Sequence, residues 1–290
     1  MNLKDADKFG IIDIGSNTIR GVLYGADGEV RDNIAFESRL LADTQDGALS
    51  PKGIFALCQT LENILERFCG EGCTCTYAFA TSAMRDVQNF DVVYREVLEK
   101  TGLKIDLLSG EREAECDFFA IRTAVGKESG IGVDLGGGSA QIVCFDKDGV
   151  TESCSLPIGV KRVRNMFCKD FVPDGAEKEK IKGYIARQLE CIKGRSDTVL
   201  FMGGTAKAVQ KAAEKLFGGK ELSAERTEQI FEMTSGNRQL LEKLFGKRYA
   251  TMPVGMIVMG EICRALGAKD IDVTGAGVRD GYIDMLSKRL

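Results

Sequence analysis

The sequence contains no histidine among its 290 residues. This absence excludes Ser-His-Asp and Cys-His catalysis, zinc sites with histidine ligands, and histidine acid–base chemistry. Tryptophan is absent as well, and proline occurs only four times. Any acid–base chemistry must therefore come from Asp, Glu, Lys, Tyr or Cys.

No export signal or membrane segment is recognisable. Asp5 and Asp7 occupy positions where a signal peptide needs apolar residues. The longest apolar runs fall well short of the ~20 residues that span a bilayer. The ten cysteines include no C-x-x-C pair, Cys73 and Cys75 coming closest. We expect mostly reduced, apolar thiols in a cytoplasmic protein without a membrane partner, and keep a thiol-dependent enzyme and a Cys-only metal site as alternatives.

The charge is nearly balanced. The net charge is −4, and acids and bases are interspersed, which argues against a protein that holds DNA or RNA by bulk charge. Lys161, Arg162 and Arg164 form a local basic segment that either follows a polyanion or is a solvated helix face. The hydrophobic share of 44% is enough for one large or two mid-sized domains.

The chain repeats itself at an offset of 121 residues. Asp13, Gly15 and Gly28 correspond to Asp134, Gly136 and Gly149 at this offset. Each half is predicted to open with three strands, an Asp-x-Gly turn after the first strand and an Asp-Gly turn after the second. A repeat of this length predicts two similar domains, residues 1–127 and 128–276.

The glycine turns are the candidate binding elements. Small residues in a tight turn expose backbone N–H groups on one concave edge, which suits phosphate oxygens. Asp13 and Asp134 each end the strand before such a turn, where a carboxylate can hold Mg²⁺. A third turn, Gly203-Gly204-Thr205, opens a helix, and a helix N-terminus is itself an anion site. The alternative for any single turn is plain hairpin geometry.

Six segments in this order resemble the exopolyphosphatase/guanosine pentaphosphate phosphatase (Ppx/GppA) family of the actin-like ATPase superfamily. They are 13–18 (DIGSNT), 81–85 (TSAMR), 109–114 (SGEREA), 134–139 (DLGGGS), 202–205 (MGGT) and 278–281 (VRDG). The chain resembles the short, two-domain members. The resemblance implies an α/β fold of two RNase-H-like (actin-like ATPase) domains with mixed five-stranded sheets that flank a central cleft. It also implies that the C-terminal helix, residues 277–290, returns to the first domain.

The resemblance also implies roles for individual residues. Glu113 matches the family's catalytic glutamate and would be the general base. Asp134, and second to it Asp13, would hold Mg²⁺, and Gln141 would position water. The phosphate-binding residues would be Gly15, Ser16, Asn17, Arg85, Gly136, Gly137, Gly138, Ser139, Gly204 and Thr205.

Two positions depart from the family pattern. Arg112 stands where the family usually has a second acid, and we expect its charge to lower the pKa of Glu113. Gln141 stands where the family usually has Glu, and an amide supplies no charge to a metal. Both departures predict altered metal use or a shifted substrate preference.

Three functions remain open. The resemblance favours a Mg²⁺-dependent hydrolase that releases terminal orthophosphate from inorganic polyphosphate, from guanosine pentaphosphate, or from both. A non-catalytic polyphosphate or nucleotide sensor is favoured by the two departures. An ATP-dependent small-molecule kinase is disfavoured by the fit of segments 81–85 and 109–114. Homodimers occur in the resembled family.

Overall fold

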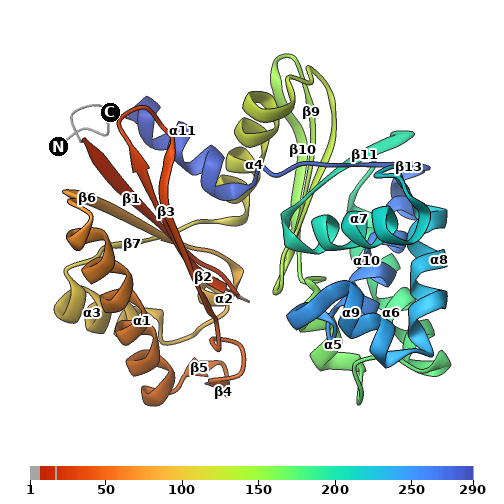
Figure 1. Ribbon diagram of the computed structural model, residues 1–290, viewed down its shortest axis with the longest axis horizontal. Coiled ribbons are helices and arrows are strands. Elements are labelled where there is room, and N and C mark those ends of the chain that lie inside the picture. The colour runs from red at the N-terminus through yellow and green to blue at the C-terminus, as the bar shows by residue number, and fades with distance from the viewer. Residues whose placement is uncertain (1–6, 17, 290) are drawn as a thin grey trace. The chain divides into compact units, whose positions relative to one another are not determined.

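The computed structural model describes residues 7–16 and 18–289, and Figure 1 shows its course. The chain divides into two compact units. Unit 1 comprises Met1–Glu113 and Tyr282–Leu290, and unit 2 comprises Ala114–Gly281. Of the helices described, none combines the length and the apolar character needed to cross a membrane.

The described part of unit 1 contains a mixed five-stranded sheet in the order β3-β2-β1-β6-β7. Its strands are β1 (Lys8–Ile14), β2 (Thr18–Gly25), β3 (Val30–Glu37), β6 (Cys75–Ala80) and β7 (Ile105–Leu107). β1, β2 and β3 pair antiparallel, and β6 and β7 run parallel to β1. The β2–β3 turn follows the Asp-Gly prediction: Gly28 has φ +78°, and the Asp27 carboxylate accepts the Glu29 N–H at 3.0 Å.

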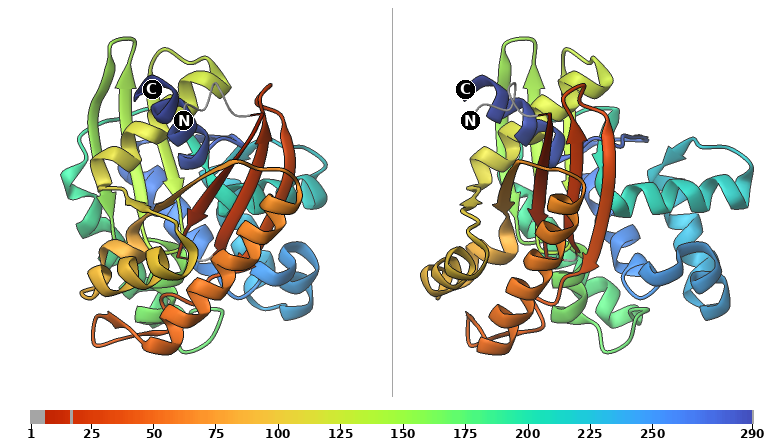
Figure 2. Two further views of the ribbon diagram at one scale, coloured as in Figure 1. Left: turned by 90° about the vertical axis from the view of Figure 1, so that its left-hand side faces the viewer. Right: turned by 60° about the vertical axis from the view of Figure 1, so that its left-hand side comes forward.

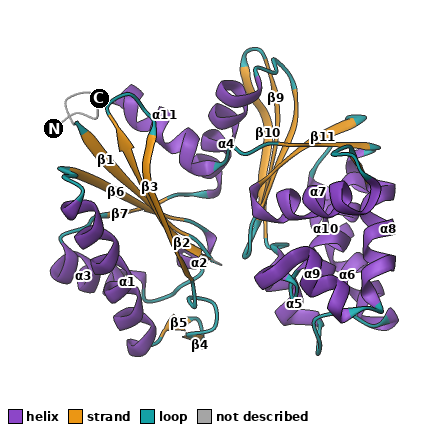
Figure 3. Cartoon of the chain, in the orientation of Figure 1, coloured by secondary structure: helices purple, strands orange, loops and turns teal. Residues whose placement is uncertain are grey.

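Helices cover both faces of this sheet (Figures 2 and 3). α1 (Pro51–Gly70) begins at Ser50, whose hydroxyl accepts the Gly53 N–H at 3.2 Å. The apolar stripe of α1 packs with α3 (Phe90–Thr101) and one sheet face into a buried core. On the other face lies α11 (Val278–Arg289), whose Tyr282 ring lies 4.6 Å from that of Phe79. The smaller elements are β4 (Thr44–Gln45), β5 (Ala48–Leu49) and α2 (Ser82–Arg85).

Unit 2 repeats this topology, so the duplication expected from the sequence is present in the fold. Its described strands follow the order β10-β9-β8-β11-β13-β12, and the first five match β3-β2-β1-β6-β7. They are β8 (Gly130–Leu135), β9 (Ala140–Asp146), β10 (Gly149–Leu156), β11 (Thr198–Met202), β13 (Asp270–Val273) and β12 (Leu222–Ser223). The expectation of five strands was wrong for this sheet, because the short β12 adds itself antiparallel to the edge strand β13.

One face of the second sheet packs against the main helical layer of unit 2. These helices are α5 (Val160–Phe167), α6 (Gly175–Gln188), η2 (Leu189–Cys191), α7 (Gly203–Phe217), α8 (Ala224–Ser235), α9 (Arg238–Phe245), η3 (Gly246–Arg248) and α10 (Met252–Leu266). The opposite face packs against α4 (Gly110–Val125), as Figure 1 shows.

The division between the units differs from the boundary expected at residues 127/128. It falls inside α4, between Glu113 and Ala114. The physical reason is the apolar face of this helix: Phe118 and Ile121 pack with Val143 of the second sheet. α4 begins directly after β7 of unit 1, but most of the helix is part of unit 2. A repeat recognised from strands and turns does not reveal where this helix packs.

Candidate active site

The first glycine turn lies in unit 1, after Asp13. The Gly15 N–H donates to the Thr18 carbonyl oxygen at 3.1 Å, which closes the turn. Ser16 is 5% exposed, and its hydroxyl oxygen lies 3.4 Å from that of Ser82 at the start of α2. Asn17, the third residue expected here, lies outside the described residues.

The second turn, in unit 2, is closed in the equivalent way. The Gly136 N–H donates to the Ser139 carbonyl oxygen at 3.0 Å, the equivalent of the first turn's bond. Ser139 and Gln141 are both buried. The Gln141 amide nitrogen donates to the hydroxyls of Ser139 at 2.8 Å and Ser155 at 3.0 Å. Gln141 therefore fixes the serine that ends the turn.

Helix α5 holds the second turn from behind. The N–H groups of Val160 and Lys161 donate to the carbonyls of Gly136 and Gly137 at 3.0 and 2.9 Å, and Arg162 Nε donates to the Gly138 carbonyl at 2.7 Å. In a planar trans peptide the N–H points opposite to the carbonyl. The N–H groups of the next residues, 137–139, therefore point away from α5 and form a nest of donors suited to an anion.

This arrangement explains part of the basic segment noted in the sequence. Arg162 Nε donates to the carbonyl side of the turn, so this arginine supports the anion nest from the side opposite its N–H groups. The turn also packs on Gly159, where a Cβ atom would lie 2.3 Å from the Gly138 carbonyl carbon and 2.4 Å from the Ser139 nitrogen. Only glycine fits at position 159 without displacing the turn.

The third turn lies beside Asp134. Gly203 has φ +86°, and a Cβ atom there would lie 2.9 Å from Asp134 Oδ1. The turn opens α7, whose N-cap residue has an apolar side chain that offers no acceptor to the first-turn N–H groups. Thr205 is 3% exposed. Asp134 and the N-terminus of α7 are thus neighbours.

Sequence reasoning missed Arg248. Its guanidinium covers Gly204, where a Cβ atom would lie 2.5 Å from Arg248 Nη2. A guanidinium at a helix N-terminus adds to the positive field of the helix dipole and strengthens an anion site. No local pattern marks Arg248 in the sequence, because η3 reaches α7 only through the tertiary fold.

Glu113 and Arg85 form an ion pair in unit 1. Arg85 Nη1 lies 2.7 Å from Glu113 Oε2 and donates to the Leu108 carbonyl oxygen at 2.8 Å. The side chains are 20% and 5% exposed. α2 supplies the arginine and the first turn of α4 supplies the glutamate. The exposed Glu111 lies two residues before Glu113 in the same helix. The pKa of Glu111 is lowered by its own backbone N–H, by the Ser109 hydroxyl and then by the charge of Arg85.

Arg112 forms an ion pair with Asp106, and its expected effect on the pKa of Glu113 stays a prediction. Its guanidinium makes two bonds to the Asp106 carboxylate, at 2.7 and 2.8 Å, and the Tyr282 hydroxyl also donates to this carboxylate at 3.3 Å. The cation paired with Glu113 is Arg85 instead. The side chains of neighbouring helix residues diverge, so adjacency in sequence did not identify the partner.

The two candidate metal ligands lie in different electrostatic surroundings. Asp13 pairs across the sheet with Arg20 and Phe79, whereas Asp134 pairs with Gln141 and Met202. Within residues 7–16 and 18–289, no group of three or more His, Cys, Asp or Glu could hold a metal ion. Mg²⁺ usually keeps waters and takes one or two carboxylates plus substrate phosphates, so Asp134 and the adjacent N–H nest fit a phosphate-bound Mg²⁺.

Solved structures share this fold. A Ppx/GppA family member from Aquifex aeolicus has 21% identity and a TM-score of 0.81, covering 98% of this chain and 99% of its own. An exopolyphosphatase from Cytophaga hutchinsonii has 18% identity and a TM-score of 0.87, covering 97% and 98%. The predicted fold, two actin-like ATPase domains with mixed sheets, is confirmed.

Sequence comparisons identify relatives along most of the chain. Exopolyphosphatase 1 of Mycobacterium tuberculosis is 26% identical to this chain over an alignment of 302 positions. The alignment covers 95% of this chain and 87% of the relative. A guanosine-5'-triphosphate,3'-diphosphate pyrophosphatase of Photobacterium profundum is 22% identical over 72% of this chain and 44% of its own length. The profile of the Ppx/GppA phosphatase family matches residues 35–290. The predicted class of enzyme, a hydrolase of phosphoanhydrides, is confirmed, and the chain belongs to the Ppx/GppA phosphatase family.

Proposed function

We propose that this protein releases orthophosphate from the end of inorganic polyphosphate, and that it accepts guanosine pentaphosphate as a second substrate. The observation that supports the proposal best is the pair of equivalent turns after Asp13 and Asp134, closed by the same backbone hydrogen bond. The names of the relatives from Mycobacterium tuberculosis and Photobacterium profundum agree with these two substrates.

The second turn is the stronger phosphate site. Its three N–H groups, at residues 137–139, point to one side because α5 binds the carbonyls. The α7 N-terminus and Arg248 add positive charge next to Asp134. Donors fixed in place before the substrate arrives need no reorganisation as charge develops on a transferring phosphoryl group.

Glu113 is the proposed general base. Its pairing with Arg85 favours the ionised carboxylate, which is the form that accepts a proton. A water molecule attacks the terminal phosphorus and gives its proton to Glu113, and the bridging P–O bond breaks. The shortened chain leaves with the bridging oxygen, and the attacking oxygen stays with the released orthophosphate.

Mg²⁺ is the proposed cofactor, and bound at Asp134 it would neutralise phosphate charge. Asp13 is a weaker candidate ligand, because Arg20 lies opposite it on the neighbouring strand. We also propose a cytoplasmic location, since all ten cysteines are free and reduced thiols persist in that compartment.

Orthophosphate release tests the proposal. Purified protein with Mg²⁺ is incubated with long-chain polyphosphate and, separately, with guanosine pentaphosphate, and free orthophosphate is measured over time. We expect release from polyphosphate, with remaining chains that shorten gradually. Saturable binding of both compounds without release would contradict the proposal and identify a sensor. Arg112, one of the two departures that favour a sensor, forms an ion pair with Asp106.

A further inference from the structure

A row of four side chains crosses the second sheet at the glycine turn. Ser155, Gln141, Asp134 and Met202 are direct partners on β10, β9, β8 and β11. Directly paired residues point to the same face of a sheet, and their Cβ atoms lie roughly 4.5–5.5 Å apart. Gln141 is therefore the residue that stands beside Asp134 where a second carboxylate would complete a metal site.

The Gln141 amide is committed to other partners. It is 1% exposed, and its nitrogen donates to the hydroxyls of Ser139 and Ser155. Met202 on the other side of Asp134 is apolar and buried. The strand partners on both sides of Asp134 are thus uncharged, and the part of the chain that the structure describes has no three-carboxylate or mixed cluster for a metal.

The same amide sets the direction of the Ser139 hydroxyl. Because Ser139 Oγ accepts a hydrogen bond from Gln141, its own O–H is available to donate to a phosphate oxygen in the adjacent N–H nest. A carboxylate at position 141 can only accept, so the Ser139 O–H would donate to that carboxylate instead. Gln141 therefore favours phosphate and disfavours a bare metal ion at one and the same turn.

We propose that residue 141 makes this turn a receptor for a metal–phosphate chelate, and that without phosphate the turn holds no resident divalent ion. One carboxylate is a poor cage for a cation that prefers six oxygen ligands. A phosphate group bound by the nest supplies the further oxygens. The preference for a phosphate compound rests on the proposed function, whereas the weakness of the metal site without phosphate does not.

Mn²⁺ binding tests this inference without turnover. Wild-type protein and Gln141→Glu are dialysed against Mn²⁺, alone and with methylenediphosphonate, whose P–C–P bridge resists hydrolysis. Electron paramagnetic resonance measures free Mn²⁺ on each side. For the wild type we expect retention of Mn²⁺ to rise at least about tenfold when the diphosphonate is present, and Asp134→Asn to abolish the rise. For Gln141→Glu we expect at least about tenfold tighter binding of Mn²⁺ alone, because two carboxylates then stand side by side.

Controls separate the charge from the lost hydrogen bonds. Gln141→Met removes the amide without adding charge and is expected to gain no affinity for Mn²⁺ alone. The melting temperature of Gln141→Glu is measured with and without Mn²⁺, and a rise on adding the metal shows a folded protein with a new site.

The binding of Mn²⁺ by the wild type tests the inference even if Gln141→Glu fails to fold. Tight wild-type binding of Mn²⁺ alone that disappears in Asp134→Asn would overturn the inference. So would equal Mn²⁺ affinity of folded Gln141→Glu and Gln141→Met. If the chelate is bound as expected but no orthophosphate is released from any substrate, the proposed function fails and this inference stands.

Discussion

The two glycine turns close with the equivalent backbone hydrogen bond but differ in the residue that pairs with their aspartate. Both close with one N–H to carbonyl bond over three residues. The strand partner of Asp13 is Arg20, whose Nη1 donates to Asn33 Oδ1 at 2.6 Å, and the strand partner of Asp134 is the neutral Gln141. At the repeat offset of 121 residues, Arg20 of the first half corresponds to Gln141 of the second. A basic residue therefore pairs with Asp13 across the strands of unit 1, whereas an uncharged residue pairs with Asp134 in unit 2.

The helices over the two aspartate faces differ as well. In unit 1, α11 packs on the sheet face that carries Asp13, where Tyr282 contacts Phe79. In unit 2, α4 packs through Phe118 and Ile121 on the sheet face that carries Asp134. Of these two helices, α4 carries a buried acid, Glu113, in its first turn. The proposed base therefore comes from one helix, although the glycine turn occurs in both units.

Removing the proposed base is expected to have the largest effect. Glu113→Gln keeps the shape and removes the proton acceptor, so kcat for orthophosphate release should fall about 100-fold to 10,000-fold. The matched control is Glu111→Gln, an exposed acid in the same helical turn, for which we expect a change of less than about threefold. Similar losses for both variants would show that helix charge, and not Glu113, is responsible.

Displacing the second turn should have the next largest effect. Gly159→Ala places a Cβ atom against the backbone of Gly138 and Ser139, and overpacking of this kind costs about 1–3 kcal/mol. We expect a lower melting temperature and a kcat reduced by about 10-fold to 100-fold. Gly175→Ala, where a Cβ atom meets nothing within 4 Å, should change neither. An active, stable Gly159→Ala protein would contradict the role given to α5.

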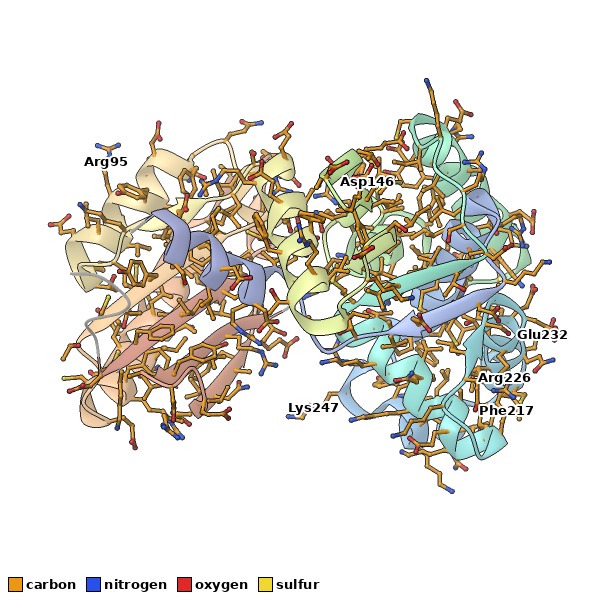
Figure 4. The ribbon with its side chains drawn as sticks, turned by 90° about the horizontal axis from the view of Figure 1, so that it is seen from above. Arg95, Asp146, Phe217, Arg226, Glu232 and Lys247 are labelled. Carbon is orange, nitrogen blue, oxygen red and sulfur yellow. The ribbon has the colours of Figure 1, made fainter. Side chains whose placement is uncertain are left out.

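Arg248 should contribute to substrate binding more than to chemistry. Arg248→Gln removes a charge-assisted contact worth about 1.5 kcal/mol or more, so we expect KM for polyphosphate to rise about tenfold with a smaller change in kcat. Lys247, which points outward from unit 2 in Figure 4, provides the neighbouring control. If Lys247→Gln raises KM equally, the effect comes from general surface charge.

The smallest expected effect concerns stability and pH. The pKa of Glu152 is lowered, chiefly by the Lys193 N–H and also by that of Gly194. Its carboxylate therefore stabilises the fold above the ordinary pKa of about 4.5, and this contribution is lost as the pH falls through the lower folded value. Glu152→Gln should reduce the free energy of unfolding by about 1 kcal/mol at pH 7. Urea unfolding should show this deficit shrinking toward pH 4, and a deficit that grows on acidification would contradict the assignment.

Much of the fold was predictable because its signals are local and doubled. The match of Asp13 with Asp134 and of Gly28 with Gly149 placed both hairpins. The three glycine turns were recognisable from their own residues, whereas the role of Glu113 came from the family resemblance. The structure shows the turns closed by their own backbone and the acid on the first turn of α4.

The remainder depends on contacts between distant segments, which no local pattern records. Glu113 forms an ion pair with Arg85, 28 positions away in the sequence, and Arg112 forms one with Asp106. The support of the second turn by α5 and the position of Arg248 over Gly204 arise only when strands and helices have packed. The division between the units differs from the predicted boundary for the same reason, because the apolar face of α4 packs against the second sheet.

The contrast between the two aspartates is the claim most directly open to test. Orthophosphate release from long-chain polyphosphate is measured across a Mg²⁺ titration for the wild type, Asp134→Asn and Asp13→Asn. We expect Asp134→Asn to need at least about tenfold more Mg²⁺ or to lose activity, and Asp13→Asn to keep the wild-type Mg²⁺ midpoint. Equal shifts in both variants, or a shift in Asp13→Asn alone, would contradict the assignment of the metal-bound phosphate to unit 2.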